Sequence, residues 1–151
     1  MRTERLLVIQ EHDAISAGLH WDVRFEHYKG DTKRYDEMRP ITNEPTKSKS
    51  TRVLRSLVIP KHRLPELGER LLVIGVEDHP WEYRDFEGEI KDGYGKGMVK
   101  LLHNDYTLVE TYSKDKIVFT YEGERYKIYA APWMKAKDRY LITKLQGEEN
   151  E

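Results

Sequence analysis

Short runs of β-branched and aromatic residues recur along this chain, and each run is bounded by Gly, Pro, Asp or Asn. The 3.6-residue period that would bury one face of a helix is hard to find in it. Many short strand-like runs with turn residues between them are typical of a barrel or a sandwich. The sequence therefore predicts a mainly β fold, a small antiparallel β barrel with one or two short helices.

Strand-like runs extend over the whole chain. In the second half, Asn104-Asp105 and Glu122-Gly123 stand between such runs at hairpin distances, which predicts an antiparallel meander there. One short helix is expected at 62–70. The expected strands are 5–10, 20–26, 52–59, 71–76, 98–103, 106–112, 116–121, 124–131 and 140–144.

The length of 151 residues suits one domain with its own core, so 1–151 is expected to form a single domain. Residues 31–50 are rich in charge, Pro, Thr and Ser and have almost nothing to bury, which predicts a long surface loop. The polar tail at 147–151 is expected to fray.

Charge and cysteine content exclude several classes of function. The 26 Lys and Arg residues balance 27 Asp and Glu residues, so a site for a polyanion must be a local patch. The absence of Cys excludes a thiolate metal site and a thiol nucleophile. No apolar run is long enough for a signal peptide or a membrane span, so we expect a cytoplasmic protein with no membrane partner.

The run HWDVRFE at 20–26 combines titratable side chains with the alternating pattern of a β-strand. Strand geometry sends alternate side chains to opposite faces, which separates an apolar set from a polar one. The alternative is an ordinary solvated face with an ion pair between Asp22 and Arg24. The apolar set is Trp21, Val23 and Phe25, and the polar set is His20, Asp22, Arg24 and Glu26.

The run QEH at 10–12 ends the preceding strand, which places His12 to face the same side as His20 and Asp22. Two imidazoles and a carboxylate suit manganese, iron or zinc better than magnesium or calcium, which prefer oxygen ligands. For His12 alone, a capping or hydrogen-bonded loop histidine is the alternative.

A third cluster of titratable groups, VEDHPWEY at 76–83, follows a buried-looking strand. A histidine such as His79, close to a metal-bound phosphate, would stabilise developing charge or donate a proton to a leaving oxygen. Lys61 and Arg70 are expected to add positive charges that bind a phosphate. The alternatives are a strand end with a Pro-stopped turn and ordinary surface charges.

The run GYGKG at 93–97 resembles a nucleotide-binding loop, but a strand pattern rather than a helix follows it. Phosphate-binding glycine loops need a helix amino terminus aimed at the phosphate. A glycine-rich bend between strands is therefore expected.

Together these motifs resemble the 3′-phosphoesterase module of bacterial DNA ligase D and of free-standing archaeal and bacterial proteins. The family pattern Gln-x-His-Asp-Ala, followed by Leu-His-Tyr-Asp-Phe-Arg-Leu-Glu, is similar to QEHDAISAGLHWDVRFE here. Further similar segments follow in the same order: IPK, VEDHPWEYRDFEG, KDGYGKGMV and the closing RYLITKL. The resemblance covers about Val8 to Val99 and the last strand.

The resemblance implies a small β barrel with a crescent-shaped active-site groove. It implies that His12, His20 and Asp22 bind a catalytic Mn²⁺, and that Arg24 and His79 hold the scissile phosphate. The remaining matched positions would contact substrate or orient the site: Gln10, Lys61, Arg70, Glu77 and Tyr83.

The implied activity is Mn-dependent healing of DNA 3′ ends. The enzyme would remove a 3′-phosphate, and also a 3′-terminal ribonucleoside, from primer-template ends to leave a 3′-hydroxyl. A separately encoded ligase or polymerase is the implied partner. The acidic amino-terminal arm of the ligase modules has no counterpart here, so the monoesterase is the firmer expectation.

Two other functions fit parts of the pattern. A non-catalytic nucleic-acid-binding barrel would use Trp21, Trp81, Tyr83 and Tyr94 to stack on bases, but the balanced charge predicts no broad phosphate-tracking surface. A non-haem iron oxygenase would use His20, Asp22 and His79 as its two-histidine, one-carboxylate ligands.

Overall fold

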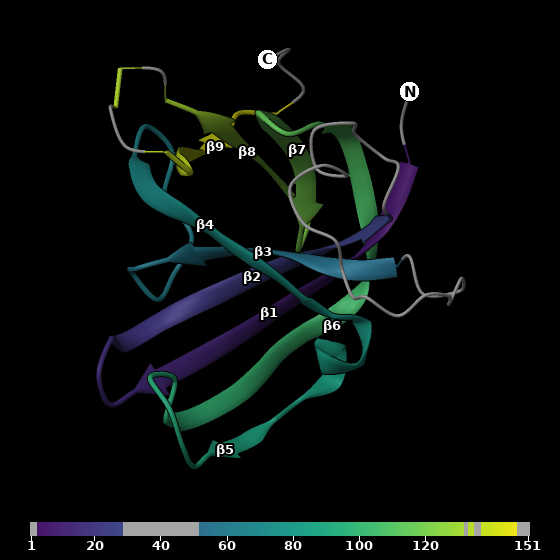
Figure 1. Ribbon diagram of the computed structural model, residues 1–151. Coiled ribbons are helices and arrows are strands. Elements are labelled where there is room, and N and C mark those ends of the chain that lie inside the picture. The colour runs from purple at the N-terminus through teal and green to yellow at the C-terminus, as the bar shows by residue number, and fades with distance from the viewer. Residues whose placement is uncertain (1–2, 29–51, 132, 135–136, 148–151) are drawn as a thin grey trace.

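The computed structural model describes residues 3–28, 52–131, 133–134 and 137–147, and these are mostly strand (Figure 1). The loop predicted at 31–50 and residues 148–151 of the predicted tail lie outside the described residues. The elements are β1 (Thr3–Ala14), β2 (Gly18–Tyr28), β3 (Arg52–Ile59), β4 (Arg70–Pro80), the 3₁₀ helix η2 (Trp81–Asp85), β5 (Gly88–Ile90), β6 (Gly97–Tyr112), β7 (Lys116–Tyr121), β8 (Glu124–Ala130) and β9 (Arg139–Leu145).

The strands form one sheet in the order β1-β2-β3-β4-β9-β8-β7-β6-β5, and an additional β1–β6 pairing closes it into a barrel-like ring. Every pairing between these strands is antiparallel. Closure leaves few unpaired strand edges. The predicted mainly β, antiparallel fold and the meander in its second half are confirmed. No helix in the described ranges has the length and apolar character needed to cross a membrane.

Strand alternation divides the side chains of β1, β2 and β3 between two apolar clusters. Val23 and Phe25 lie in the main core inside the ring, with Trp21 packed against it, as the sequence predicts. On the opposite face, Leu6, Val8 and Leu54 form a smaller cluster, against which Trp81, Tyr83 and Leu101 pack. The polar set of β2 therefore lies on the face that this second cluster partly covers.

The hairpin predicted at Asn104-Asp105 is wrong, because β6 runs without a break from Gly97 to Tyr112. Asn104 and Asp105 pair with Val8 and Leu7 of β1. Asp105 Oδ1 accepts a hydrogen bond from the Tyr106 amide at 2.8 Å. The side chain expected to stabilise a turn therefore bonds to the backbone of the continuous strand. The turn at Glu122-Gly123 is confirmed, with positive φ at both residues.

The helix predicted at 62–70 is also wrong, because the described backbone there forms bends and turns. Pro65 disfavours helical backbone in the residue before it. Glu69 stabilises the non-helical conformation of this segment. It forms an ion pair with Arg63 at 2.7 Å and accepts a hydrogen bond from the Glu66 amide at 2.8 Å. The sequence prediction also missed η2, and it ended β4 at Val76 although the strand continues to Pro80.

Gly97 begins β6 at a point where the chain cannot carry a side chain. Its φ is +149°, and a Cβ there would lie 2.2 Å from the Asp13 carbonyl oxygen. Gly93 also has a positive φ, +89°, but a Cβ there would meet nothing within 4 Å.

We expect Gly97→Ala to lower the free energy of unfolding by about 3 kcal/mol, because strain and a backbone clash add together. Gly93→Ala, which adds strain alone, should cost about 1 kcal/mol. Urea denaturation measures both, and equal losses for the two variants would contradict the importance of the Gly97–Asp13 contact.

Candidate metal centre

The polar face of β1, β2 and β3 is assembled by strand register. Gln10 pairs with Asp22 and His12 pairs with His20 across β1 and β2. Paired residues point to the same side of a sheet, so residues from separate motifs become neighbours. The two strands therefore bring the QEH and HWDVRFE motifs together.

The carboxylate of Asp22 lies between the two imidazoles. Its Oδ2 is 3.6 Å from His12 Nδ1, and its Oδ1 is 3.4 Å from His20 Nε2. One ligand atom from each of the three residues lies within 4.8 Å of the others, which makes the group a possible metal site. The His12 and His20 side chains are each only 12% exposed.

Backbone carbonyls orient both imidazoles. His12 Nε2 lies 2.8 Å from the Gly95 oxygen, and His20 Nδ1 lies 3.1 Å from the Gly18 oxygen. Because a carbonyl only accepts hydrogen bonds, we assign the ring proton of each neutral histidine to these nitrogens. Nδ1 of His12 and Nε2 of His20 are then left unprotonated, facing Asp22, as in histidine ligands held by a second hydrogen bond.

Two lone pairs facing a carboxylate require a cation or a proton between them. Accordingly, the interaction with Asp22 raises the pKa of His12, against the opposing effect of burial. Burial by itself would raise the pKa of Asp22, but its interactions with His12 and His20, which form when the imidazoles are protonated, and the charge of Arg24 hold it well below its usual range. This donor set fits a divalent transition ion, which would replace the proton.

Arg24 is buried beside this group, only 3% exposed. Its Nε donates to Gln10 Oε1 at 2.7 Å, its Nη1 donates to Ser56 Oγ at 2.8 Å, and its Nη2 lies 3.6 Å from Asp22 Oδ2. Burial lowers the pKa of Arg24, and Asp22 and Tyr83 oppose that effect. The guanidinium thus places a fixed positive charge next to the possible metal site.

His79 reaches the same face because β4 contains a bulge. Leu54 pairs with His79 and Ser56 pairs with Val76, so two residues of β4 stand opposite one residue of β3. Strict alternation would have placed His79 and Val76 on opposite faces. His79 Nδ1 instead lies 3.3 Å from Ser56 Oγ and 3.2 Å from the Glu77 carbonyl oxygen.

Gln10 and Tyr83 attach the 3₁₀ helix to this face. Gln10 is fully buried, and its Nε2 donates to the carbonyl oxygens of Tyr83 at 3.3 Å and Phe86 at 3.1 Å. The Tyr83 ring lies 5.1 Å from the His79 ring and 5.0 Å from the Arg24 guanidinium. Gln10 therefore positions Arg24, and the Tyr83 ring packs against both Arg24 and His79.

The other three sequence candidates are Glu77, Lys61 and Arg70. The side chain of Glu77 is exposed in the β4 bulge, its carbonyl oxygen contacts His79, and its charge opposes the lowering of the His79 pKa. Lys61 is exposed two residues beyond the end of β3. Arg70 pairs with Thr143 at the start of β4, nine residues from His79, which is roughly 30 Å of extended strand.

Sequence reasoning missed Ser56 and Gly95. Ser56 links Arg24 to His79, and its signal was a lone hydroxyl in the otherwise apolar run SLVI of a buried strand. Gly95 contributes only its backbone oxygen, and a Cβ there would come within 3.5 Å of His12 Cε1. The Gly95 interaction uses only the backbone, so no side-chain pattern in the sequence displays it.

Comparison with known proteins adds no family assignment. No protein-family model matches the chain, and no curated protein matches it.

Removing a ligand from the group should weaken Mn²⁺ binding. We expect His12→Ala and Asp22→Asn each to reduce Mn²⁺ affinity by at least about tenfold, measured from free Mn²⁺ by electron paramagnetic resonance. His62→Ala removes an exposed histidine outside the group and is the matched control. Unchanged affinity in both ligand variants would rule out this metal site.

Burial and the charge of Arg24 lower the pKa of His79 to about 4. A histidine in the unfolded chain binds its proton near pH 6.5, so the contribution of His79 to stability is lost as the pH falls from about 6.5 to about 4. An NMR titration of the metal-free protein should place the His79 midpoint near the lower value. A midpoint near 6.5 would contradict the buried, uncharged ring.

Proposed function

We propose that this protein is a Mn²⁺-dependent phosphoesterase that heals DNA 3′ ends, removing a 3′-phosphate and a 3′-terminal ribonucleoside to leave a 3′-hydroxyl. One observation carries the proposal. The buried guanidinium of Arg24 lies 3.6 Å from a carboxylate that forms, with two imidazoles, a possible metal group. An anion held between a metal ion and a guanidinium is the arrangement that phosphoryl transfer needs.

His12 Nδ1, His20 Nε2 and an Asp22 oxygen would hold the Mn²⁺. When bound, the ion would supply Lewis-acid chemistry, polarising a phosphate oxygen and offsetting its charge. The carbonyl oxygens of Gly95 and Gly18 keep both imidazoles in the ligand tautomer.

Arg24 would bind the phosphate through Nη2. Its Nε and Nη1 donate to Gln10 and Ser56, which fix the plane of the guanidinium and leave the Nη2 edge nearest Asp22 and the metal group. Because the group is held before substrate arrives, it stabilises charge on the equatorial oxygens without reorganising.

His79 would supply a second contact to the phosphate. Ser56 Oγ and the Glu77 oxygen both lie within hydrogen-bond distance of Nδ1, which places a proton on that nitrogen. In the free protein the low pKa of about 4 keeps the ring uncharged at neutral pH. A phosphate anion beside the ring favours its protonated form, so substrate binding lets His79 stabilise negative charge.

The direct test is a 5′-labelled primer-template that ends in a 3′-phosphate, incubated with and without Mn²⁺, with the two kinds of end resolved on a gel. We expect Mn²⁺-dependent conversion to a 3′-hydroxyl. Asp22→Asn, which keeps the shape of the side chain but loses its charge, should reduce the rate on the order of 100-fold.

His62→Ala should retain wild-type activity in the same assay, because its exposed side chain lies outside the group. Absence of conversion by folded, Mn²⁺-loaded wild-type protein would overturn the proposed phosphoesterase activity. Binding of the same primer end without conversion would favour the non-catalytic alternative.

A further inference from the structure

A pocket of about 350 Å³ opens beside the possible metal site. Its wall includes the His12 and His20 rings, and no other lining residue carries an ionisable side chain except Tyr94. A small-molecule site typically has this size and this mainly apolar lining with a few polar groups. The remaining lining residues are Ala14, Ala17, Val58, Pro60, Ile74 and Gly95.

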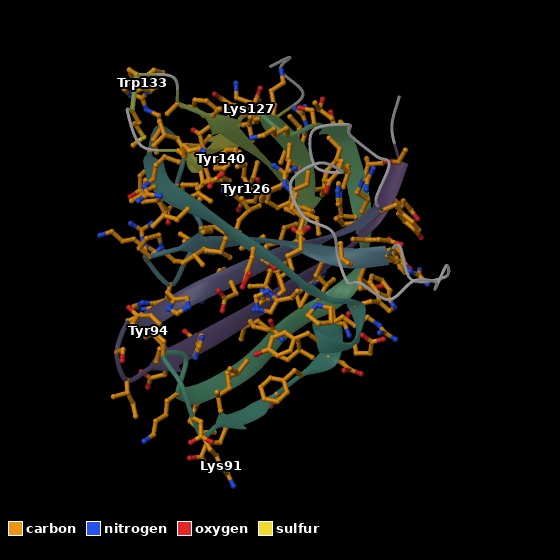
Figure 2. The ribbon with its side chains drawn as sticks, viewed as in Figure 1. Lys91, Tyr94, Tyr126, Lys127, Trp133 and Tyr140 are labelled. Carbon is orange, nitrogen blue, oxygen red and sulfur yellow. The ribbon has the colours of Figure 1, made fainter. Side chains whose placement is uncertain are left out.

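Tyr94 makes this pocket suitable for a flat ring. It lies in the bend between β5 and β6, and its side chain is 74% exposed even though it lines the pocket. Figure 2 shows Tyr94 at the end of the molecule where the β1–β2 hairpin turns, away from Tyr126 and Tyr140. An exposed aromatic ring beside an apolar cavity provides a stacking surface for a nucleobase.

The opposite end of the same face carries two arginines, Arg52 and Arg84, beside Trp81. Arg52, Leu54, Ser56 and Val58 alternate along β3, so Val58 at the pocket and Arg52 are six residues, or roughly 20 Å, apart. The Arg52 guanidinium lies 4.2 Å from the centre of the Trp81 ring.

Arg84 also stacks on Trp81, at 4.7 Å. Arg52 pairs with Glu26 at 3.3 Å, whereas Arg84 donates to the Trp81 carbonyl oxygen and forms no ion pair with a carboxylate among the described residues. The face therefore runs from a mainly apolar pocket, past the metal group and Arg24, to two arginines stacked on Trp81. Glu26 pairs with Arg52, and Glu82 and Asp85 stand in the same 3₁₀ helix as Arg84.

The difference between the two ends of this face matches the difference between the two sides of a scissile phosphate. The primer strand upstream carries further phosphates and requires cations, whereas a 3′-terminal nucleoside carries none beyond the scissile one. We propose that the pocket is the subsite for the terminal nucleoside, with its base against Tyr94, and that the upstream backbone extends toward Arg52 and Arg84. This inference rests on the proposed phosphoesterase function.

The step that the subsite serves is a hydrolysis. Water attacks phosphorus, the bond from phosphorus to O5′ of the terminal nucleoside breaks, and a proton from water ends on O5′. The products are a primer 3′-phosphate and a free nucleoside. Removal of the 3′-phosphate itself leaves the pocket empty, since nothing lies beyond the phosphate.

The two activities therefore provide a test within one protein. We expect Tyr94→Ala to lower kcat/KM for removal of a terminal ribonucleoside about tenfold, the loss of one base-stacking contact, and to change removal of a 3′-phosphate less than twofold. Tyr94→Phe keeps the ring and should retain both activities. Trp133→Ala, which removes an exposed tryptophan from the segment between β8 and β9, is the control.

Binding of adenosine to metal-free protein gives a readout that needs no catalysis. Amide NMR shifts at Gly95 and Ala17 are expected on adding adenosine, absent on adding ribose, and greatly weakened in Tyr94→Ala. No adenosine-dependent shift at these residues would overturn the subsite.

The assays distinguish the failure of this inference from the failure of the proposed function. Wild-type protein inactive on both substrates would overturn the phosphoesterase proposal. Activity on the 3′-phosphate but not on the terminal ribonucleoside would overturn the subsite alone. An equal loss of both activities in Tyr94→Ala would overturn it too, because the bend would then act on His12 through Gly95.

Discussion

The site depends on one buried guanidinium whose charge and donors must be satisfied inside the protein. Arg24 comes from β2, and its partners are Gln10 from β1, Ser56 from β3 and the carboxylate of Asp22. Leaving a buried charge without partners costs several kcal/mol, so this network strongly favours one register among the three strands. Gln10 extends the network to η2 through two backbone oxygens.

Ring closure places the backbone oxygen that orients His12. β1 lies between β2 and β6, so His12 pairs with His20 on one side and with Val99 on the other. The bend before β6 then carries Gly95 over the His12 ring. A glycine at position 97 lets the two backbones approach closely enough for this contact, because a Cβ would collide with Asp13.

The second apolar cluster gives the site its low dielectric surroundings. Trp81, Tyr83 and Leu101 pack on Leu6, Val8 and Leu54, on the same side of the sheet as the polar residues. Desolvation there lowers the pKa of His79 and of Arg24, and it strengthens each charge interaction with Asp22. The face therefore combines fixed charges with water exclusion, the combination on which electrostatic stabilisation of a phosphate depends.

Local periodicity in the sequence was enough to predict the mainly β architecture, the placement of Trp21, Val23 and Phe25 in the core, and the common face of His20, Asp22 and Arg24. These follow from a two-residue repeat that each strand carries by itself. Tertiary structure decided the rest. The β4 bulge that turns His79 toward Ser56, the unbroken course of β6 through Asn104 and Asp105, and the pocket beside Tyr94 all arise from pairing between distant segments. Register, bulges and backbone contacts depend on which strands meet, and no local residue pattern specifies them.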